Sequence, residues 1–203
     1  MLSPVANLII LIIFGYLIGS IPFGFLISKA KGVDIKKIGS GNIGGTNVSR
    51  ALGWQSGLLV SVLDILKGVI PVCLAISFLV SDWQIALAAI TPILGHIFPI
   101  WLKFKGGKGV ATTFGVLAVL LGWKFFLVWV FAWLIILATS KVMSFTNLLM
   151  ASFLPLIFWL SSFSLAYFIF GFVLAVLIWW MHKENLQRIK QGIEPKFKLK
   201  KSI

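Results

Sequence analysis

Three short polar stretches interrupt an otherwise apolar sequence and hold most of the residues that could do chemistry. They read 39-GSGNIGGTN-47, 103-KFKGGKG-109 and 182-HKENLQR-188. Glycine lets backbone N–H groups converge on an anion, and hydroxyl, amide and cationic side chains can complete its hydrogen bonds. We therefore expect these stretches to bind phosphate or carboxylate groups.

The first stretch has four glycines among nine residues, followed three residues later by Arg50. Ser40, Asn42, Thr46 and Asn47 alternate with those glycines. A flexible connector between two membrane spans is the alternative interpretation. Two asparagines and an arginine favour anion binding over a simple linker.

The second stretch sets Gly106, Gly107 and Gly109 around Lys108, with Lys105 before them and an apolar segment after them. This pattern is typical of an anion site at a helix N-terminus, where free N–H groups and the helix dipole favour negative charge. It is not a nucleotide-binding P-loop, because Gly109 stands where Ser or Thr would follow the lysine. The alternative is a glycine turn with lysines retained in the cytoplasm.

The third stretch places His182, Asn185 and Arg188 at positions i, i+3 and i+6, where a continuing helix would keep them near one face. Ser144, beside Lys141, could add a hydroxyl at the same depth. The alternatives are a polar cluster at the level of the lipid headgroups and, for Ser144, a simple helix start.

These stretches must be positioned by membrane helices. The chain is 60% hydrophobic and 11% charged, with a mean hydropathy of +1.06, which excludes a water-soluble fold. Alternation with period two is absent, so we predict an all-α polytopic integral membrane protein rather than a barrel. The sequence predicts one transmembrane domain over residues 1–203, with a basic tail from about residue 195. Its seven transmembrane helices are expected at residues 4–28, 57–80, 83–102, 110–122, 124–140, 145–161 and 163–181, the fourth being the shortest.

The basic residues predict the orientation of these spans. Of 18 Lys and Arg residues, all but Lys67 and Lys124 fall on one alternating set of segments. Because positive loops are retained in the cytoplasm, we expect the N-terminus outside, the C-terminus in the cytoplasm and all three polar stretches at the cytoplasmic face. The tail 196-KFKLKK-201 is expected to lie on anionic membrane lipids. Nucleic acid is not an expected partner, because no soluble domain is available to bind it.

The remaining titratable residues limit the chemistry. The five acids form no cluster for Mg²⁺, and His96 and His182 lack zinc-ligand spacing, so we expect no metal and no cofactor. Asp64 and Lys67 are spaced to pair on one helix face, and Gly15 with Gly19 forms a GxxxG packing motif. A Ser–His–acid triad cannot be assembled, whereas donors for two anions are abundant. Acyl transfer from an activated acyl compound to a phosphorylated alcohol fits this inventory.

Three segments also carry a resemblance to a known family. They are 37-KIGSGNIGGTNVSRALG-53, 95-GHIFPIWLKFKGGKGVAT-112 and 182-HKENLQRIKQGIE-194. They closely resemble the cytoplasmic motifs of the bacterial acyl-phosphate-dependent glycerol-3-phosphate acyltransferases, the PlsY family. The resemblance implies transfer of a fatty acyl group from acyl phosphate to glycerol 3-phosphate, giving lysophosphatidic acid and phosphate. It also implies a seven-span protein of the bacterial plasma (inner) membrane, whose cytoplasmic active site starts phospholipid synthesis without a classical catalytic base.

The same resemblance assigns roles to residues. Glycerol 3-phosphate would meet Ser40, Arg50, Ser144, His182 and Asn185, and the loop from Lys105 to Gly109 would hold acyl phosphate. The predicted catalytic residues are Ser40, Lys105, Lys108, Ser144 and His182. The predicted substrate-binding residues are Gly41, Asn42, Thr46, Asn47, Arg50, His96, Gly106, Gly107, Gly109, Asn185 and Arg188.

Several alternatives stay open at this stage. The sequence does not decide whether Lys105 or Lys108 matters more, or whether the donor phosphate or His96 accepts the proton. Gly45 stands where the family commonly has Ala, and Lys183 where it often has Arg; neither change removes a functional group. An anion transporter would need polar residues through the bilayer and two related halves, and neither is evident. A non-catalytic lipid-binding or assembly protein would have no use for the Gly–Lys loop.

Overall fold

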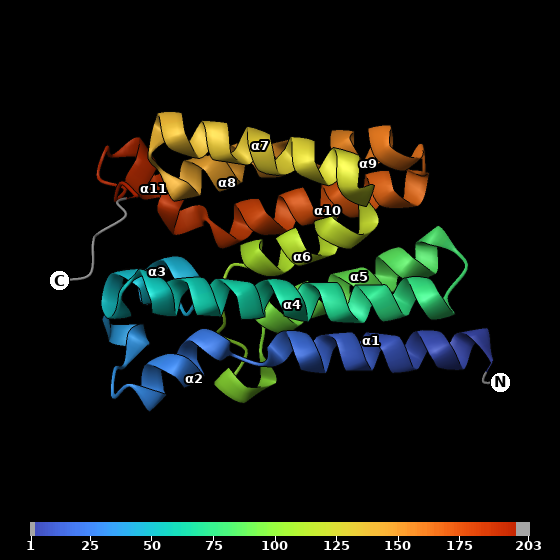
Figure 1. Ribbon diagram of the computed structural model, residues 1–203, viewed down its shortest axis with the longest axis horizontal. Coiled ribbons are helices and arrows are strands. Elements are labelled where there is room, and N and C mark those ends of the chain that lie inside the picture. The colour runs from blue at the N-terminus through green and yellow to red at the C-terminus, as the bar shows by residue number, and fades with distance from the viewer. Residues whose placement is uncertain (1–2, 198–203) are drawn as a thin grey trace. The chain divides into compact units, whose positions relative to one another are not determined.

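The computed structural model describes residues 3–197. All regular secondary structure in that range is helical (Figure 1). The predicted all-α class is therefore confirmed. Residues up to Val119 form one compact unit and those from Leu120 form a second. The α-helices are α1 (Pro4–Ser20), α2 (Phe23–Ala30), α3 (Gly45–Leu52), α4 (Trp54–Phe78), α5 (Asp82–Ile97), α6 (Val110–Leu120), α7 (Gly122–Ser140), α8 (Met143–Ser152), α9 (Leu154–Ser162), α10 (Leu165–Met181) and α11 (Lys183–Lys190). The short 3₁₀ helices are η1 (Ile35–Lys37) and η2 (Ile100–Leu102).

Several of these helices are long and apolar enough to cross a membrane. Four candidate spans cover Pro4–Ala30, Trp54–Phe78, Asp82–Leu102 and Gly122–Ser140. The pairs α8 with α9 and α10 with α11, bent by 46° and 61°, raise the number to six if each pair is one span. Helix α6 is apolar but shorter than the roughly 20 residues that a bilayer requires. The chain is thus a multi-helix integral membrane protein, whereas a seventh span, the single domain and the direction of the termini stay predictions.

Two predicted spans are broken in the structure, each beside a proline. The segment predicted at 4–28 divides at Ile21 and Pro22, between α1 and α2 (Figure 1). The segment predicted at 145–161 divides at Phe153, and Pro155 follows in the first turn of α9. Proline has no N–H to donate and its ring clashes with the carbonyl four residues earlier, which disfavours a continuous helix, although Pro71 and Pro92 are accommodated inside α4 and α5.

Close contact between α1 and α5 organises the first unit. A side chain at Gly15 would collide with Thr91, and one at Gly19 would collide with the backbone of Pro92. In return, Gly95 of α5 lies against the backbone of α1 at Tyr16. The predicted packing role of the GxxxG motif is therefore confirmed, and it fixes the end of α5 from which the second polar stretch departs.

Candidate active site

The first polar stretch is folded around one buried asparagine. Asn47, on α3, is only 2% exposed, and its Nδ2 donates to the carbonyls of Ile38 and Asn42, both at 2.9 Å. Its Oδ1 accepts from the N–H of Ser40 at 3.0 Å. Asn47 therefore organises the loop, and its side-chain hydrogen bonds are used internally rather than offered to a ligand.

The glycines of this stretch serve turns and close packing. Gly39 and Gly41 have φ of +58° and +67°, in the left-handed region that glycine adopts most easily. Asn42 Oδ1 accepts from the N–H of Gly44 at 2.8 Å, which turns the chain into α3. Gly45 begins that helix and lies against Gly57 and Ser61 of α4, so it is a packing position.

The side chains that remain available at this stretch are Ser40 and Arg50, which are both exposed. Arg50 lies in the last turn of α3. Thr46 is half-buried in the first turn of the same helix. A hydroxyl and a guanidinium near a tightly fixed loop form a credible site for a phosphate dianion, since guanidinium groups bind such oxygens in pairs.

The second stretch is bonded to the end of α5. The N–H of Gly106 donates to the carbonyl of Ile97, and the N–H of Gly107 to that of His96, each at 3.0 Å. Lys103 and Phe104 reverse the chain with φ of 54° and 60°. The N–H groups of Gly106 and Gly107 are thus already used, which corrects the expectation that they converge on an anion.

Anion binding at this stretch must therefore use its second half. Gly109, with φ of +79°, leads into α6, and its carbonyl accepts from the N–H of Thr113 at 2.8 Å. A helix leaves its first N–H groups without an intrahelical acceptor, here those of residues 110–112. Lys105 is exposed and Lys108 half-buried beside them. Helix N-terminus and ammonium groups together suit a negative charge.

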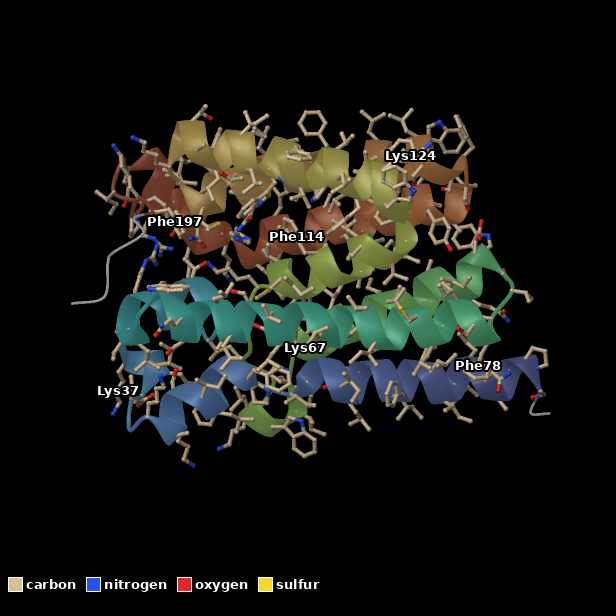
Figure 2. All side chains as sticks on the ribbon, viewed as in Figure 1. Lys37, Lys67, Phe78, Phe114, Lys124 and Phe197 are labelled. Atoms are coloured by element: carbon tan, nitrogen blue, oxygen red, sulfur yellow. The ribbon has the colours of Figure 1, made fainter. Side chains whose placement is uncertain are left out.

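A buried charged cluster lies beneath the second stretch. Lys67 Nζ lies 2.9 Å from Asp64 Oδ1, with both side chains 2% exposed, so the predicted pair is confirmed. Lys67 Nζ also donates to the carbonyl of Ile21 at 3.0 Å, at the break between α1 and α2 (Figure 2). His96 Nδ1 lies 3.6 Å from the same Asp64 oxygen, and the imidazole is 4% exposed. His96, which the sequence analysis gives as a substrate-binding residue and an alternative proton acceptor, is therefore enclosed beside charged side chains rather than open to solvent.

In the second unit, the polar side chains converge on one carboxylate. Ser144 Oγ and Asn185 Nδ2 donate to Glu194 Oε1 at 2.7 and 2.6 Å. Arg188 Nε donates to Glu194 Oε2 at 2.6 Å. Ile193 N–H returns to the Arg188 carbonyl after a turn at Gly192, whose φ is +72°. This turn brings Glu194 back onto α11.

The environment of Glu194 sets its protonation. Partial burial raises the pKa of its carboxyl, but the hydrogen bonds from Ser144, Asn185 and Arg188, with the charge of Arg188, lower that pKa further than burial raises it. The net pKa lies below the ordinary value of 4.5, so Glu194 is ionised at neutral pH. A stable carboxylate therefore holds three predicted site residues in one place.

His182 lies where α10 ends and α11 begins. It is 2% exposed, and its Nδ1 is 2.8 Å from the carbonyl of Ile178. A carbonyl only accepts, so we assign a proton to Nδ1. This hydrogen bond fixes the orientation of the ring at the junction of the two helices.

Known proteins resemble this chain over nearly its whole length. The sequence model of the family described as glycerol-3-phosphate acyltransferase matches residues 9–192. The chain belongs to the glycerol-3-phosphate acyltransferase family. Its predicted membership is thus confirmed, and it is an acyltransferase of the PlsY type.

Individual relatives agree with this membership. A glycerol-3-phosphate acyltransferase of Thermus thermophilus is 43% identical, over 90% of this chain and 92% of its own. That of Aquifex aeolicus is 39% identical, over 92% of this chain and 97% of its own.

Two solved structures share the fold. Crystal structures of PlsY (YgiH), an integral membrane glycerol 3-phosphate acyltransferase, are 39% identical to this chain. The glycerol 3-phosphate form has a TM-score of 0.89 and matches 94% of this chain and 96% of its own. The lysophosphatidic acid form has a TM-score of 0.86 and matches 95% and 96%.

The structure divides the predicted site residues between its two units. The first unit holds Ser40, Gly41, Asn42, Thr46, Asn47, Arg50, His96, Lys105, Gly106, Gly107, Lys108 and Gly109. The second unit holds Ser144, His182, Asn185 and Arg188. Sequence reasoning missed Glu194 as the shared partner of that second group. Its signal was present, because one of only five acids follows Arg188 after a glycine.

Proposed function

We propose that the chain transfers a fatty acyl group from acyl phosphate to glycerol 3-phosphate, yielding lysophosphatidic acid and inorganic phosphate. The observation that carries the proposal is the 39% identity, over 94% of the chain, to PlsY in its glycerol 3-phosphate form. The three polar stretches that carry the resemblance to acyl-phosphate-dependent enzymes support the choice of donor. No metal or cofactor is part of the proposal.

The first unit is assigned to the phosphate of acyl phosphate and to the phosphate of glycerol 3-phosphate. The N-terminus of α6 with Lys105 and Lys108 would bind the phosphate of acyl phosphate. Hydrogen bonds from this helix terminus and these lysines would also stabilise the negative charge that builds on the departing phosphate. Ser40 and Arg50, exposed beside their fixed loop, would bind the phosphate of glycerol 3-phosphate. Both assignments rest on cationic and N–H donors that suit phosphate oxygens.

The second unit is assigned to the rest of glycerol 3-phosphate. Ser144, His182 and Asn185 would contact this substrate, and Arg188 would hold Glu194, which fixes their arrangement. The hydroxyl oxygen of glycerol 3-phosphate forms a bond to the acyl carbon, and the bond from that carbon to the phosphate oxygen breaks. The hydroxyl proton passes to the departing phosphate. The buried position of His96 favours this route over a proton transfer to that imidazole.

We further propose seven membrane spans in a bacterial inner membrane, with the N-terminus outside and both polar clusters at the cytoplasmic face. The distribution of basic residues supports this orientation. Cysteines introduced at Ser3 and Lys196 in a Cys73→Ser background test it. Membrane-impermeant maleimide should label position 3 in intact cells and position 196 only after lysis. The reverse pattern would invert the topology.

The activity is tested with purified protein in detergent or lipid. Glycerol 3-phosphate is supplied with palmitoyl phosphate, palmitoyl-CoA or palmitoyl-acyl carrier protein, in the presence of EDTA. We expect lysophosphatidic acid from palmitoyl phosphate alone. Product only from a thioester would keep the acyltransferase class and overturn the donor, and product that disappears with EDTA would overturn the metal-free mechanism.

A further inference from the structure

His96 supports the second polar stretch from below through two kinds of contact. Its carbonyl and that of Ile97 accept the N–H groups of Gly107 and Gly106 at 3.0 Å. In addition, a methyl group placed on Gly107 would overlap Nε2 of the imidazole, so the ring lies directly against the loop backbone. The path of the loop at Gly107 therefore depends on where this ring lies.

Asp64 lies beside the ring on the other side. His96 Nδ1 is 3.6 Å from Asp64 Oδ1, and the two side chains are 4% and 2% exposed. The same oxygen is 2.9 Å from Lys67 Nζ, and Lys67 is held to the Ile21 carbonyl at 3.0 Å. A carboxylate held in place by an ammonium group puts a fixed negative charge beside the imidazole, inside the membrane helices.

Neutralising Lys67 does not require His96. Asp64 and Lys67 lie on one helix and pair with each other, so a purely structural ion pair would be complete without a histidine. His96 lies between this ion pair and the loop that leads into α6. All three side chains are almost fully buried, and none of them is assigned to a substrate contact in the proposed function.

We propose that Asp64 and His96 are positioning residues for the donor-phosphate loop, residues 105–109, with Lys67 anchoring Asp64 to the break between α1 and α2. This inference rests on the proposed function, because it assigns the loop to acyl phosphate. The cluster acts on donor binding through the backbone at Gly107. It does not act on glycerol 3-phosphate.

A double-mutant cycle tests the contact between the ring and the loop. Gly107→Ala alone should lower kcat/KM for acyl phosphate about 10- to 100-fold, because the new methyl displaces the loop. In a His96→Ala background the methyl has room, and the same change should cost less than about threefold. Equal losses in both backgrounds would show that ring and loop are not coupled and would overturn the proposal.

The role of Asp64 is tested with Asp64→Asn/Lys67→Met, which leaves no unpaired buried charge. We expect the KM for acyl phosphate to rise about 10- to 100-fold while the KM for glycerol 3-phosphate changes less than about twofold. Thr91→Val, a matched change on α5 whose hydroxyl bonds to Ala88, should alter neither value. A pair that only stabilises the fold would lower the melting temperature without separating the two KM values, and that result would overturn the proposal.

Hydrogen exchange at the loop amides tests the proposal without measuring enzyme activity. The double variant should lose protection at the amides of Gly106 and Gly107 and keep it in α1 and α4, whereas Thr91→Val should match the wild type. Unchanged loop protection would overturn the proposal even in an inactive protein. If the wild type makes no lysophosphatidic acid but the loop loses protection as expected, the proposed function fails and the positioning of the loop stands.

Discussion

The two polar clusters are held in place by opposite means. In the first unit, the loop of residues 103–109 is bonded backbone to backbone, above a charged cluster enclosed within the apolar helices. In the second unit, side-chain donors gather on Glu194, a carboxylate at the end of a turn whose side chain is 8% exposed. The first arrangement depends on a charge pair buried among apolar helices, and the second on one ionised carboxylate with three side-chain donors. The two should therefore fail under different conditions.

The largest expected effect is on the buried cluster. Asp64→Asn leaves Lys67 as an unpaired buried charge and should lower the free energy of unfolding by about 3–5 kcal/mol. Thermal inactivation in detergent measures this change. Asp64→Asn/Lys67→Met should recover most of the loss, and a single variant as stable as the wild type would contradict a buried charge pair.

The next largest effect is expected on substrate binding and not on stability. Arg50 is exposed, so Arg50→Ala should leave the melting temperature unchanged. Loss of a charge-assisted bond worth about 1.5–3 kcal/mol should raise the KM for glycerol 3-phosphate about 10- to 100-fold. Lys37→Ala, at an equally exposed cation, is the control (Figure 2). An unchanged KM would remove Arg50 from the site.

A smaller effect distinguishes the second cluster by its pH dependence. Glu194→Gln should lower the free energy of unfolding by about 1–3 kcal/mol at pH 7. Because the folded pKa of Glu194 lies below 4.5, its contribution is present above that pH and is lost as the pH falls through the folded value. Melting temperatures measured from pH 7 to pH 3 should therefore converge for wild type and variant at the acid end. A constant difference would contradict the ionised carboxylate.

The smallest effect is expected at the exposed pair of Asp34 and Lys37, whose charged atoms are 3.6 Å apart. Their side chains are 49% and 84% exposed, so Asp34→Asn should cost about 0–1 kcal/mol, mostly lost at high salt. Urea or thermal unfolding at two salt concentrations measures it. A cost equal to that of Asp64→Asn would remove the distinction between buried and exposed charge.

The sequence predicted the features that depend on local pattern. The i, i+3 spacing of Asp64 and Lys67 and the GxxxG of α1 both follow from helical periodicity. The continuing helix expected through His182, Asn185 and Arg188 is wrong, because α10 ends at Met181 and α11 is bent from it by 61°. The sequence did not predict how the loop glycines are used, because Gly106 and Gly107 bond to carbonyls of α5 that only the tertiary fold brings near. Likewise, Glu194 reaches Ser144 from 50 residues away, a pairing that no periodicity encodes. Prolines alone do not predict the breaks at Pro22 and before Pro155, because Pro71 and Pro92 lie inside the unbroken helices α4 and α5.

The bond between Lys67 and the Ile21 carbonyl bears on how the protein enters its membrane. Ile21 is made 46 residues before Lys67, so this bond across the break between α1 and α2 can form only after α4 has been made. Helix α4 brings its own counter-ion, because Asp64 and Lys67 lie on the same helix, and it can therefore leave the translocon as a neutral pair. His96 is synthesised later, so the donor loop can take its final path only after the first two spans have docked. Order of synthesis and order of assembly would then coincide.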